Sequence, residues 1–597
     1  MGEVSFVNVI AGISPLRQNV KGIARTFSEE GNDMTNRRRR WGILLILALA
    51  SATGHAQEKA DLVLRGGKIV TMNPKQPQAE AIAILGSRIA RVGSAREIEA
   101  MIGPGTRVIE LNGRLVVPGF IESHGHLLGL GQSRLILDLR GTKSAEEVAE
   151  QVARKVREVR PGEWIIGRGW DQNEWPTREF PTHEVLDRVA PHNPVYLTRV
   201  DGHAAWVNRR ALELAGVTRE TADPPGGRVI RDAQGRPTGV LIDRAMNLVA
   251  RHIPPRRREE NKQALLLAIE ECLRSGITSF HDAGASREAI ELYKELLREG
   301  KLSLRLYVMI SGRDEALLRE YWQRGPEIGL GDHQLTIRAI KLVADGALGS
   351  RGAALLEPYA DEPGHAGLLL LSEEEIYRIA RQALATGFQV NTHAIGDRAN
   401  RVVLNAYERA LREFPSAKDH RFRIEHAQIL DEADIPRFAR LGVIASMQAI
   451  HATSDMPWVP ARLGEARARE GAYVWRKLLD SGARIANGSD APVEPVNPLL
   501  GFYAAITRQD ERGNPPGGWY PDQRMTREEA LRSFTLDAAY AAFEEQLKGS
   551  LEPGKLADLV VLSRDIMTIP PSEILRTEVD LTLVGGRIVY ERSSARP

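Results

Sequence analysis

The segment GFIESHGH (Gly119 to His126) decides the fold, because it leads an apolar strand directly into two metal-ligand side chains. Alternate residues of a strand share a face, so His124 and His126 can both reach one metal ion at the end of the strand. Gly125 between them leaves the backbone free to bend toward that ion. Because H-x-H pairs are common by chance, the pair alone is a weak signal and the rest of the chain must support it.

Further segments end an apolar run in a possible ligand in the same way. Polar side chains at the C-terminal ends of parallel strands are where (β/α)₈ barrels hold their chemistry. The chain offers eight candidate strands, and the ligand candidates fall on the first, fourth, fifth, sixth and eighth. The sequence therefore predicts an α/β protein with a (β/α)₈ TIM barrel and a metal site at its mouth. The further segments are IRAIKLVADG (337–346, with Lys341), QVNTHAIGD (389–397, with His393), RIEHAQ (423–428, with His426) and ANGSDAP (486–492, with Asp490).

Each of these candidates also has a structural explanation. A lone buried histidine such as His393 or His426 is often a hydrogen-bonded core residue, and Asp490 could begin a turn or cap a helix. Lys341 is the least expected, since a buried ammonium beside a cation would be repelled and desolvated. A carbamate formed from the Lys341 amine and carbon dioxide would be anionic and could bridge two metal ions. The segments support one another, which favours a shared metal site.

The order of the motifs resembles that of the amidohydrolase superfamily, in the YtcJ-like branch that includes the N-substituted formamide deformylases. The resemblance extends over nearly all of the chain after the first sixty residues, and this string of motifs is highly specific. The motifs are PGFIESHGHL, GRGWDQNEW (167–175), RVDGHAAWVNRRAL (199–212), KLVADGALGSRGAAL (341–355), NTHAIGDRA, RIEHAQ and NGSDAPVEPVNPL.

This resemblance implies a zinc-type centre with one or two Zn²⁺ ions. His124 and His126 would hold one ion, and His393 and His426 the other. Carbamylated Lys341 would bridge the two ions. By the same resemblance, Asp490 would bind the first ion and shuttle the proton.

The chain departs from the family pattern at two places. Glu122 stands where the family usually has aspartate, and we expect this to be tolerated because the side chain sits outside the histidine pair. In the fourth-strand motif, Ala347 and Gly352 replace residues that carry hydroxyl groups. The second departure puts substrate contacts at those two positions in doubt and leaves the ligand set intact.

The predicted function is a metal-dependent hydrolase of carbon–nitrogen bonds other than peptide bonds, of the amide or formamide type. A metal ion lowers the pKa of bound water from about 15.7 to about 7, and Asp490 would take the proton and pass it to the leaving amine. One alternative is a non-catalytic, metal-stabilised binding protein for small molecules, which would need no proton shuttle. Another is the same site used for deamination, ester hydrolysis or isomerisation.

Composition narrows the classes of partner. The chain has 597 residues, of which 43% are hydrophobic, so it can bury a large core. Its formal net charge of +2 argues against nucleic acid as a partner. Cys272 is the single cysteine, which excludes an intrachain disulfide and a thiolate metal site. We expect a small-molecule amide-type substrate, and the sequence leaves a homo-oligomer open.

Residues 1–56 are predicted to be a leader and signal peptide. The basic run Arg37 to Arg40 precedes the apolar stretch WGILLILALASA and the small residues before Gln57. The stretch is too short to span a membrane comfortably, so we expect no stable anchor after cleavage. With Met34 as the true start, the signal would run from Met34 to Ala56. The protein would then be periplasmic or secreted, by the general or the twin-arginine route.

One segment near each end of the chain has the same sequence pattern. DLVLRGGKIVT (61–71) and DLTLVGGRIVY (580–590) each suggest a strand, a turn at Gly-Gly and a second strand. GKLADLVVL (554–562) adds another strand. We expect a composite β-sandwich built from residues 57–115 and 551–597, flanking a barrel over residues 116–550.

An inserted subdomain is expected at about residues 138–245, after the first barrel strand. Its tryptophans, among them Trp170, could line an apolar substrate pocket or pack the core of the insert itself. His203 is a candidate oxyanion donor, and Asp171 and Arg351 are weaker candidates for substrate contact. His281 and His451 end the second and seventh candidate strands.

Overall fold

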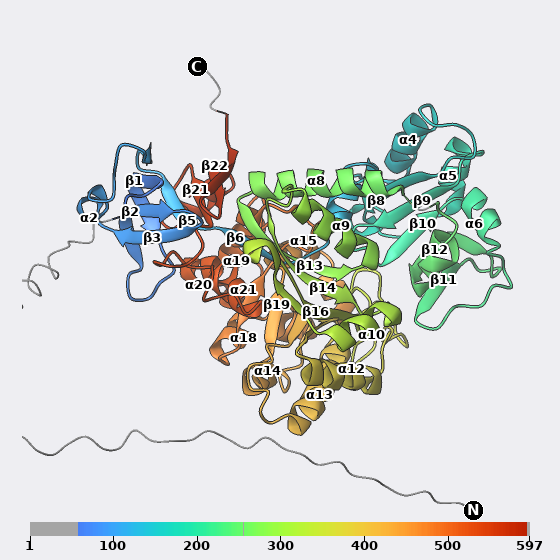
Figure 1. The fold of residues 1–597 in the computed structure, drawn as a ribbon. Coiled ribbons are helices and arrows are strands. Elements are labelled where there is room, and N and C mark those ends of the chain that lie inside the picture. The colour runs from blue at the N-terminus through green and yellow to red at the C-terminus, as the bar shows by residue number, and fades with distance from the viewer. Residues whose placement is uncertain (1–57, 255, 594–597) are drawn as a thin grey trace, which may run out of the picture. The chain divides into compact units, whose positions relative to one another are not determined.

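The computed structural model describes residues 58–254 and 256–593 (Figure 1). The predicted leader and signal peptide lie outside these residues, so the export hypothesis stays a prediction. Among the described residues, no helix combines the length and the apolar character that crossing a bilayer requires.

The centre of the fold is a parallel sheet that curves into a nearly closed barrel, which confirms the predicted fold class. Its strands follow one another in chain order, as expected for repeated βα units. The short strand β15 (Glu327–Gly329) pairs with one of them in the antiparallel sense. The barrel strands are β6 (Phe120–Gly125), β13 (Ile277–Ala285), β14 (Arg305–Ser311), β16 (Leu335–Val343), β17 (Gln389–Ala394), β18 (Arg423–His426), β19 (Ile444–Met447) and β20 (Ile485–Asn487).

Helices between the strands begin where the sequence supplies a cap and an amphipathic pattern. Ser286 caps α9 by accepting a hydrogen bond from the Ala289 amide, and Ser372 forms a capping box with Glu375 at the start of α12. The buried residues of these helices belong to the large apolar core that surrounds the barrel. The main helices are α8 (Arg258–Arg274), α9 (Arg287–Arg298), α10 (Glu315–Arg324), α12 (Glu373–Thr386), α13 (Asp397–Glu413), α14 (Ile435–Leu441) and α18 (Trp475–Asp480).

Backbone bonds join the first and last barrel strands at the C-terminal end. The Asp490 amide donates to the His124 carbonyl and the His126 amide donates to the Ala491 carbonyl, both at 2.8 Å. The Glu122 carboxylate accepts from the Ser489 amide at 2.9 Å and from the Ser489 hydroxyl at 2.6 Å. These bonds fix Asp490 beside the two histidines.

Glu122 therefore lies outside the histidine pair, as expected, and joins the ends of the barrel. Burial raises its pKa to about 8. A Cβ on Gly488 would lie 2.1 Å from Glu122 Oε1, so glycine is needed where the longer carboxylate enters. This close approach explains how glutamate is accommodated at the position.

The insert forms a six-stranded sheet of its own, in the order β11-β12-β10-β9-β8-β7 (Figure 1). It leaves the barrel just after α3 (Leu127–Ser133). Its two faces are covered by separate apolar clusters, as a small two-sided sheet requires. The strands are β7 (Leu137–Asp138), β8 (Ile165–Trp170), β9 (Val195–Arg199), β10 (Ala204–Val207), β11 (Gly227–Arg231) and β12 (Pro237–Asp243).

The chain ends meet in one further sheet, where β5 (Leu115–Pro118) pairs antiparallel with β21 (Leu559–Leu562). The other strands of this sheet are β1 (Leu62–Val70), β2 (Gln78–Leu85), β3 (Arg88–Gly93), β4 (Arg107–Glu110), β22 (Val579–Val584) and β23 (Arg587–Glu591).

The two segments that share the Gly-Gly pattern, residues 61–71 and 580–590, fold differently. Gly585 and Gly586 have φ values of 55° and 72° and form the predicted turn between β22 and β23. The prediction for the first segment is wrong, because β1 runs straight through Gly66 and Gly67 with an irregularity in its pairing to β2. Glycine is needed at position 67, since a Cβ there would lie 2.4 Å from the Arg114 carbonyl oxygen.

Candidate metal centre and substrate cavity

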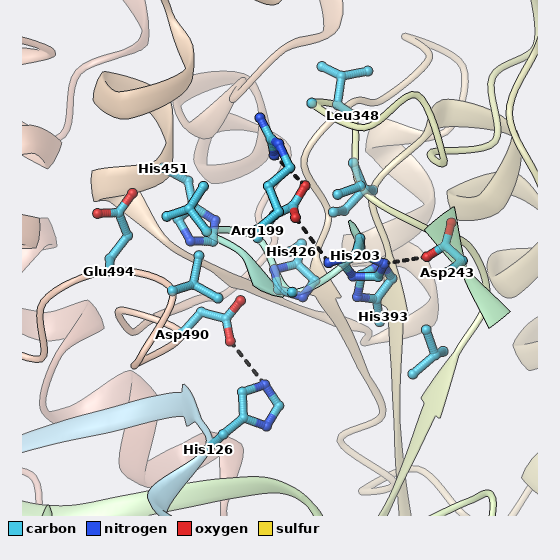
Figure 2. Close-up of a pocket in the computed structure, with 18 of the residues that line it drawn as sticks. His126, Arg199, His203, Asp243, Leu348, His393, His426, His451, Asp490 and Glu494 are labelled. Atoms are coloured by element: carbon cyan, nitrogen blue, oxygen red, sulfur yellow. Dashed lines mark hydrogen bonds and ion pairs between the residues drawn. The ribbon is translucent and has the colours of Figure 1, made fainter. Parts of the chain in front are cut away.

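A cavity of about 730 Å³ lies at the C-terminal end of the barrel strands, lined by side chains of both the barrel and the insert. Figure 2 shows His126 and Asp490 on one side and His203 and His393 on the other, with His426 between them. The four histidines predicted as ligands, Lys341 and Asp490 all line this cavity.

His124 is fully buried at the end of β6 and is held from one side by Glu425. Its Nδ1 lies 2.5 Å from Glu425 Oε2. Burial raises the pKa of Glu425, but the charge and hydrogen bond of His124 outweigh this and lower it, so Glu425 is an acceptor. Nδ1 of His124 therefore carries the proton, which leaves the Nε2 lone pair pointing toward Lys341 Nζ, 3.1 Å away.

His126 and Asp490 face each other across the mouth. His126 Nδ1 lies 2.8 Å from the Ala283 carbonyl oxygen and donates to it, so Nε2 carries the lone pair in the neutral ring. That Nε2 lies 3.1 Å from Asp490 Oδ1, and His124 Nε2 lies 3.7 Å from the same oxygen. Asp490 Oδ1 is buried and has no hydrogen-bond partner among the described residues. Two lone pairs and a carboxylate thus converge on one point.

The ligand atoms of His124, His126 and Asp490 all lie within 4.8 Å of one another. Burial alone raises the pKa of Asp490, but the neighbouring His126, His124 and His426 rings hold it well below its usual range. The carboxylate is therefore ionised, and the cluster has the composition of a cation site.

His426 and His393 complete the cluster. The His426 ring centroid lies 4.8 Å from that of His124 and 4.6 Å from that of His393. His426 Nδ1 lies 2.7 Å from Gln448 Oε1, which leaves Nε2 free. His393 Nε2 lies 3.4 Å from Asp345 Oδ1. Burial lowers the pKa of His393 to about 4, so this ring is neutral and able to bind a metal.

Lys341 lies at the centre of the group on β16. Burial lowers the pKa of its ammonium to about 8. A substantial fraction of the amine is then neutral near pH 8, which is the form that reacts with carbon dioxide.

His203 enters the cavity from the insert, as the sequence suggested. Its Nδ1 lies 2.6 Å from Asp243 Oδ1, and its backbone amide donates to Asp201 Oδ1 at 3.0 Å. Burial lowers the pKa of His203, but the hydrogen bond and charge of Asp243 and the charge of Asp201 outweigh it, so the pKa is raised. The raised pKa favours the protonated ring, which lies next to His393 with ring centroids 5.2 Å apart.

Trp170 does not line the cavity, and its predicted substrate role is wrong. The indole is completely buried, donates to the Leu197 carbonyl at 2.8 Å and packs against Trp175 and Trp206. The tryptophans of the GRGWDQNEW motif thus form the core of the insert, because a large aromatic side chain on an isolated sheet must be covered by its own subdomain.

The two other residues predicted to contact substrate, Asp171 and Arg351, both bind neighbouring side chains. Asp171 borders the cavity, but its carboxylate is hydrogen-bonded to the buried Arg199 and to the Asn173 amide. Arg351 is not among the cavity residues and binds Asp361 at 3.1 Å. The predicted substrate role of Arg351 is therefore wrong, because this side chain stabilises a loop. Both contacts of Asp171 are made by Oδ1, so its Oδ2 can still meet a ligand.

The two substitutions in the fourth-strand motif have different surroundings. Ala347 lines the cavity, whereas a Cβ on Gly352 would lie 2.6 Å from Asp243 Oδ2. Glycine at 352 thus leaves room for the carboxylate that holds His203.

Sequence reasoning missed Glu425, Asp345 and Gln448, which orient the histidines. Glu425 directly precedes His426 in RIEHAQ, and an acidic residue inside an apolar strand was the available signal. Its partner, His124, lies on a distant strand, so their contact follows only from the closed barrel.

Comparison with known proteins agrees with this geometry. Residues 107–590 match the model of the amidohydrolase family. YtcJ of Bacillus subtilis, named as an amidohydrolase, is 35% identical and is covered to 99%, with 89% of this chain matched. The N-substituted formamide deformylase of Arthrobacter pascens is 30% identical over 90% of this chain and 99% of its own length.

Among solved structures, an uncharacterized metal-dependent hydrolase from Pyrococcus horikoshii superposes with a TM-score of 0.69. It is 30% identical, and the match covers 85% of this chain and 99% of that structure. On the family match, these relatives and the barrel fold, the chain belongs to the amidohydrolase family.

Proposed function

We propose that the protein is a metal-dependent hydrolase that cleaves the carbon–nitrogen bond of a small amide or formamide. The observation that carries the proposal is the convergence of His124, His126 and Asp490 at one point of a large cavity. The similarity to an N-substituted formamide deformylase supports the choice of bond.

The residues present fit a divalent cation. Each of His124, His126 and His426 has its Nδ1 bonded to an acceptor, which leaves three Nε2 lone pairs for a metal. The buried, partnerless Asp490 Oδ1 supplies the negative charge that a metal site needs. Neutral imidazole and carboxylate are the ligand types that zinc prefers at catalytic sites. We therefore assign His124, His126, His393, His426 and Asp490 as ligands of one or two Zn²⁺ ions.

Lys341 would complete the centre as its carbamate. The neutral amine attacks carbon dioxide and releases one proton, forming an anionic group with two oxygens. This exchanges a positive charge among the histidines for a negative one, which removes the repulsion that the free ammonium would impose on a cation. The pKa of about 8 for Lys341 favours the reaction at mildly alkaline pH.

A bound divalent cation supplies the acidity that makes water nucleophilic near neutral pH and polarises the substrate carbonyl. Asp490, ionised and fixed by backbone bonds to β6, accepts the proton of the attacking water. It then returns this proton to the nitrogen of the breaking bond, so that the amine leaves neutral. His203, oriented by Asp243, donates a hydrogen bond to the oxyanion that develops on the former carbonyl.

A non-catalytic binding protein is the second candidate. Binding alone would gain nothing from an ionised aspartate aimed at the metal ligands or from a histidine that Asp243 orients at the opposite wall. Hydrolysis of esters uses the same groups and is separated from amide hydrolysis only by assay.

The test uses purified protein loaded with zinc. We expect release of butylamine and formate from N-butylformamide, and loss of this activity after chelation with recovery on adding zinc. Absence of hydrolysis of any formamide, amide or ester by protein of full zinc content would contradict the proposal.

Glu425 should control metal affinity although it binds no substrate. Glu425→Ala removes the acceptor that fixes the His124 tautomer, so we expect zinc affinity to fall by about 10- to 100-fold. Glu425→Gln keeps an acceptor for Nδ1 and should lose less. Competition with a fluorescent chelator measures both, and Glu413→Ala, which removes an exposed carboxylate on α13, is the control. Equal affinities for Glu425→Ala and wild type would refute the assignment.

A further inference from the structure

Arg168, on β8 of the insert, lines the substrate cavity and lacks an ion-pair partner among the described residues. Its Nη2 donates to the Val200 carbonyl oxygen at 2.7 Å, and the remaining donors of the guanidinium make no hydrogen bond within the described chain. The unused donors of this half-buried guanidinium are therefore available to a ligand that enters the cavity.

Arg168 is adjacent to the loop that carries Asp490. Arg168 and Pro492, two residues after Asp490, line the same small void of about 10 Å³. Burial lowers the pKa of Arg168, and the charge of Asp490 is the largest influence that opposes this. The guanidinium is thus on the same side of the cavity as the group that returns the proton.

The other charged groups of the cavity do not neutralise Arg168. The Asp201 carboxylate forms an ion pair with Arg199 at 2.6 Å, so its charge is already balanced by another arginine. Burial raises the pKa of Asp455 to about 8 and that of Glu494 to about 7, so these carboxyls carry reduced charge at neutral pH.

Two more of the arginines that line the cavity make no ion pair with any residue that the structure describes. One exposed carboxylate of the lining likewise has no ion-pair partner there. The arginines are Arg244 and Arg313, and the carboxylate is Glu511. The wall also holds the ionised Asp490, so the positive charge is local to these arginines, and they are the groups that can attract an anionic ligand.

We infer that the substrate carries a carboxylate on the amine side of the scissile bond, as N-acyl amino acids do, and that Arg168 binds this carboxylate. The inference rests on the proposed function and names its substrate class. Asp490 protonates the leaving nitrogen, and the carboxylate of an amino acid is separated from that nitrogen by a single carbon. The Arg168 guanidinium, which lies beside Asp490, is therefore placed to bind the substrate carboxylate. Its planar group of N–H donors matches the two oxygens of a carboxylate.

The reaction balances without a further reactant. Water adds its oxygen to the acyl carbon, the C–N bond breaks, and the amino acid leaves with the proton delivered to its nitrogen. Apolar residues of the cavity, among them Leu348, Leu370 and Ile379, provide a surface for the amino-acid side chain or the acyl group.

The experiment compares kcat/KM of zinc-loaded protein for three compounds. N-formylphenylalanine has the carboxylate on the amine side, its carboxamide has none, and N-butylsuccinamate has it on the acyl side. We expect N-formylphenylalanine to exceed the carboxamide by about 100-fold, as a charge-assisted hydrogen-bond pair allows. Arg168→Gln should reduce this preference to about threefold or less, with the rate for the carboxamide little changed, and Arg168→Lys should restore part of it.

Arg140→Gln is the matched control, because Arg140 lines the same cavity but is bound by Asp138 at 2.9 Å. It should retain the full preference. Equal rates for N-formylphenylalanine and its carboxamide, a preference for the succinamate, or an unchanged preference in Arg168→Gln would each overturn the inference.

The hydrolysis of neutral N-butylformamide reports the proposed function separately. If no compound is hydrolysed, the dissociation constants of the same three compounds, measured by titration calorimetry on zinc-loaded protein, test Arg168 with the same expected ratios. A 100-fold tighter binding of N-formylphenylalanine that Arg168→Gln abolishes would support the substrate class even though the hydrolase proposal had failed.

Discussion

Asp490→Asn is expected to abolish turnover while the protein still binds metal. The amide cannot accept the proton of water or return it to the leaving nitrogen, so kcat should fall by about a thousandfold. The histidine ligands remain. The loop is held by backbone bonds that do not involve the Asp490 side chain, from the Asp490 amide to the His124 carbonyl and from the His126 amide to the Ala491 carbonyl. Zinc content by elemental analysis and kcat on N-butylformamide are measured on the same preparation.

Glu174→Gln is the control for Asp490→Asn, since Glu174 is an exposed carboxylate at the same cavity that pairs with Lys143 at 3.3 Å. Its kcat should stay within about twofold of wild type. Activity of Asp490→Asn within tenfold of wild type, at equal zinc content, would exclude Asp490 as the group that moves the proton.

Lys341→Ala is expected to lose both metal and activity. The substitution removes the amine that would carry the carbamate and leaves a space next to His124. A small carboxylate should occupy that space and supply the missing oxygens, so acetate or propionate should restore part of the zinc content and of kcat. The measurement is activity as a function of acetate concentration, at fixed ionic strength.

Acetamide serves as the control for this rescue, because it has the same size as acetate and no charge. It should restore nothing. Lys341→Ala protein that is fully loaded with zinc and active without any added acid would refute the carbamate. In wild type, protein equilibrated with ¹³C-labelled carbon dioxide should show one protected carbamate resonance that Lys341→Ala lacks.

The barrel could be predicted from the sequence because its evidence is local. Each of the segments around His126, Lys341, His393, His426 and Asp490 places a polar residue directly after an apolar strand, and strand order then brings their ends to one mouth. The structure confirms that fold. It also brings these side chains into one cavity, which leaves their roles as ligands and proton carrier to the experiments above.

The remaining details depend on contacts between distant segments. Trp170 has the same sequence pattern whether it lines a pocket or packs a core, and only the covering of β8 decides between them. Arg351 and Arg168 are both arginines in glycine-rich motifs, but Asp361 neutralises the first and nothing in the described chain neutralises the second. The two Gly-Gly pairs share a sequence pattern, but β1 continues past Gly67 to pair with β5, whereas β22 ends before Gly585.

The central claim is that residues far apart in the chain hold a metal at one end of the barrel. The most direct test is a crystal structure of zinc-loaded protein with anomalous data collected at the zinc edge. We expect an anomalous peak at about 2.1 Å from the Nε2 atoms of His124 and His126. A zinc-loaded crystal with no anomalous peak in the cavity would contradict it.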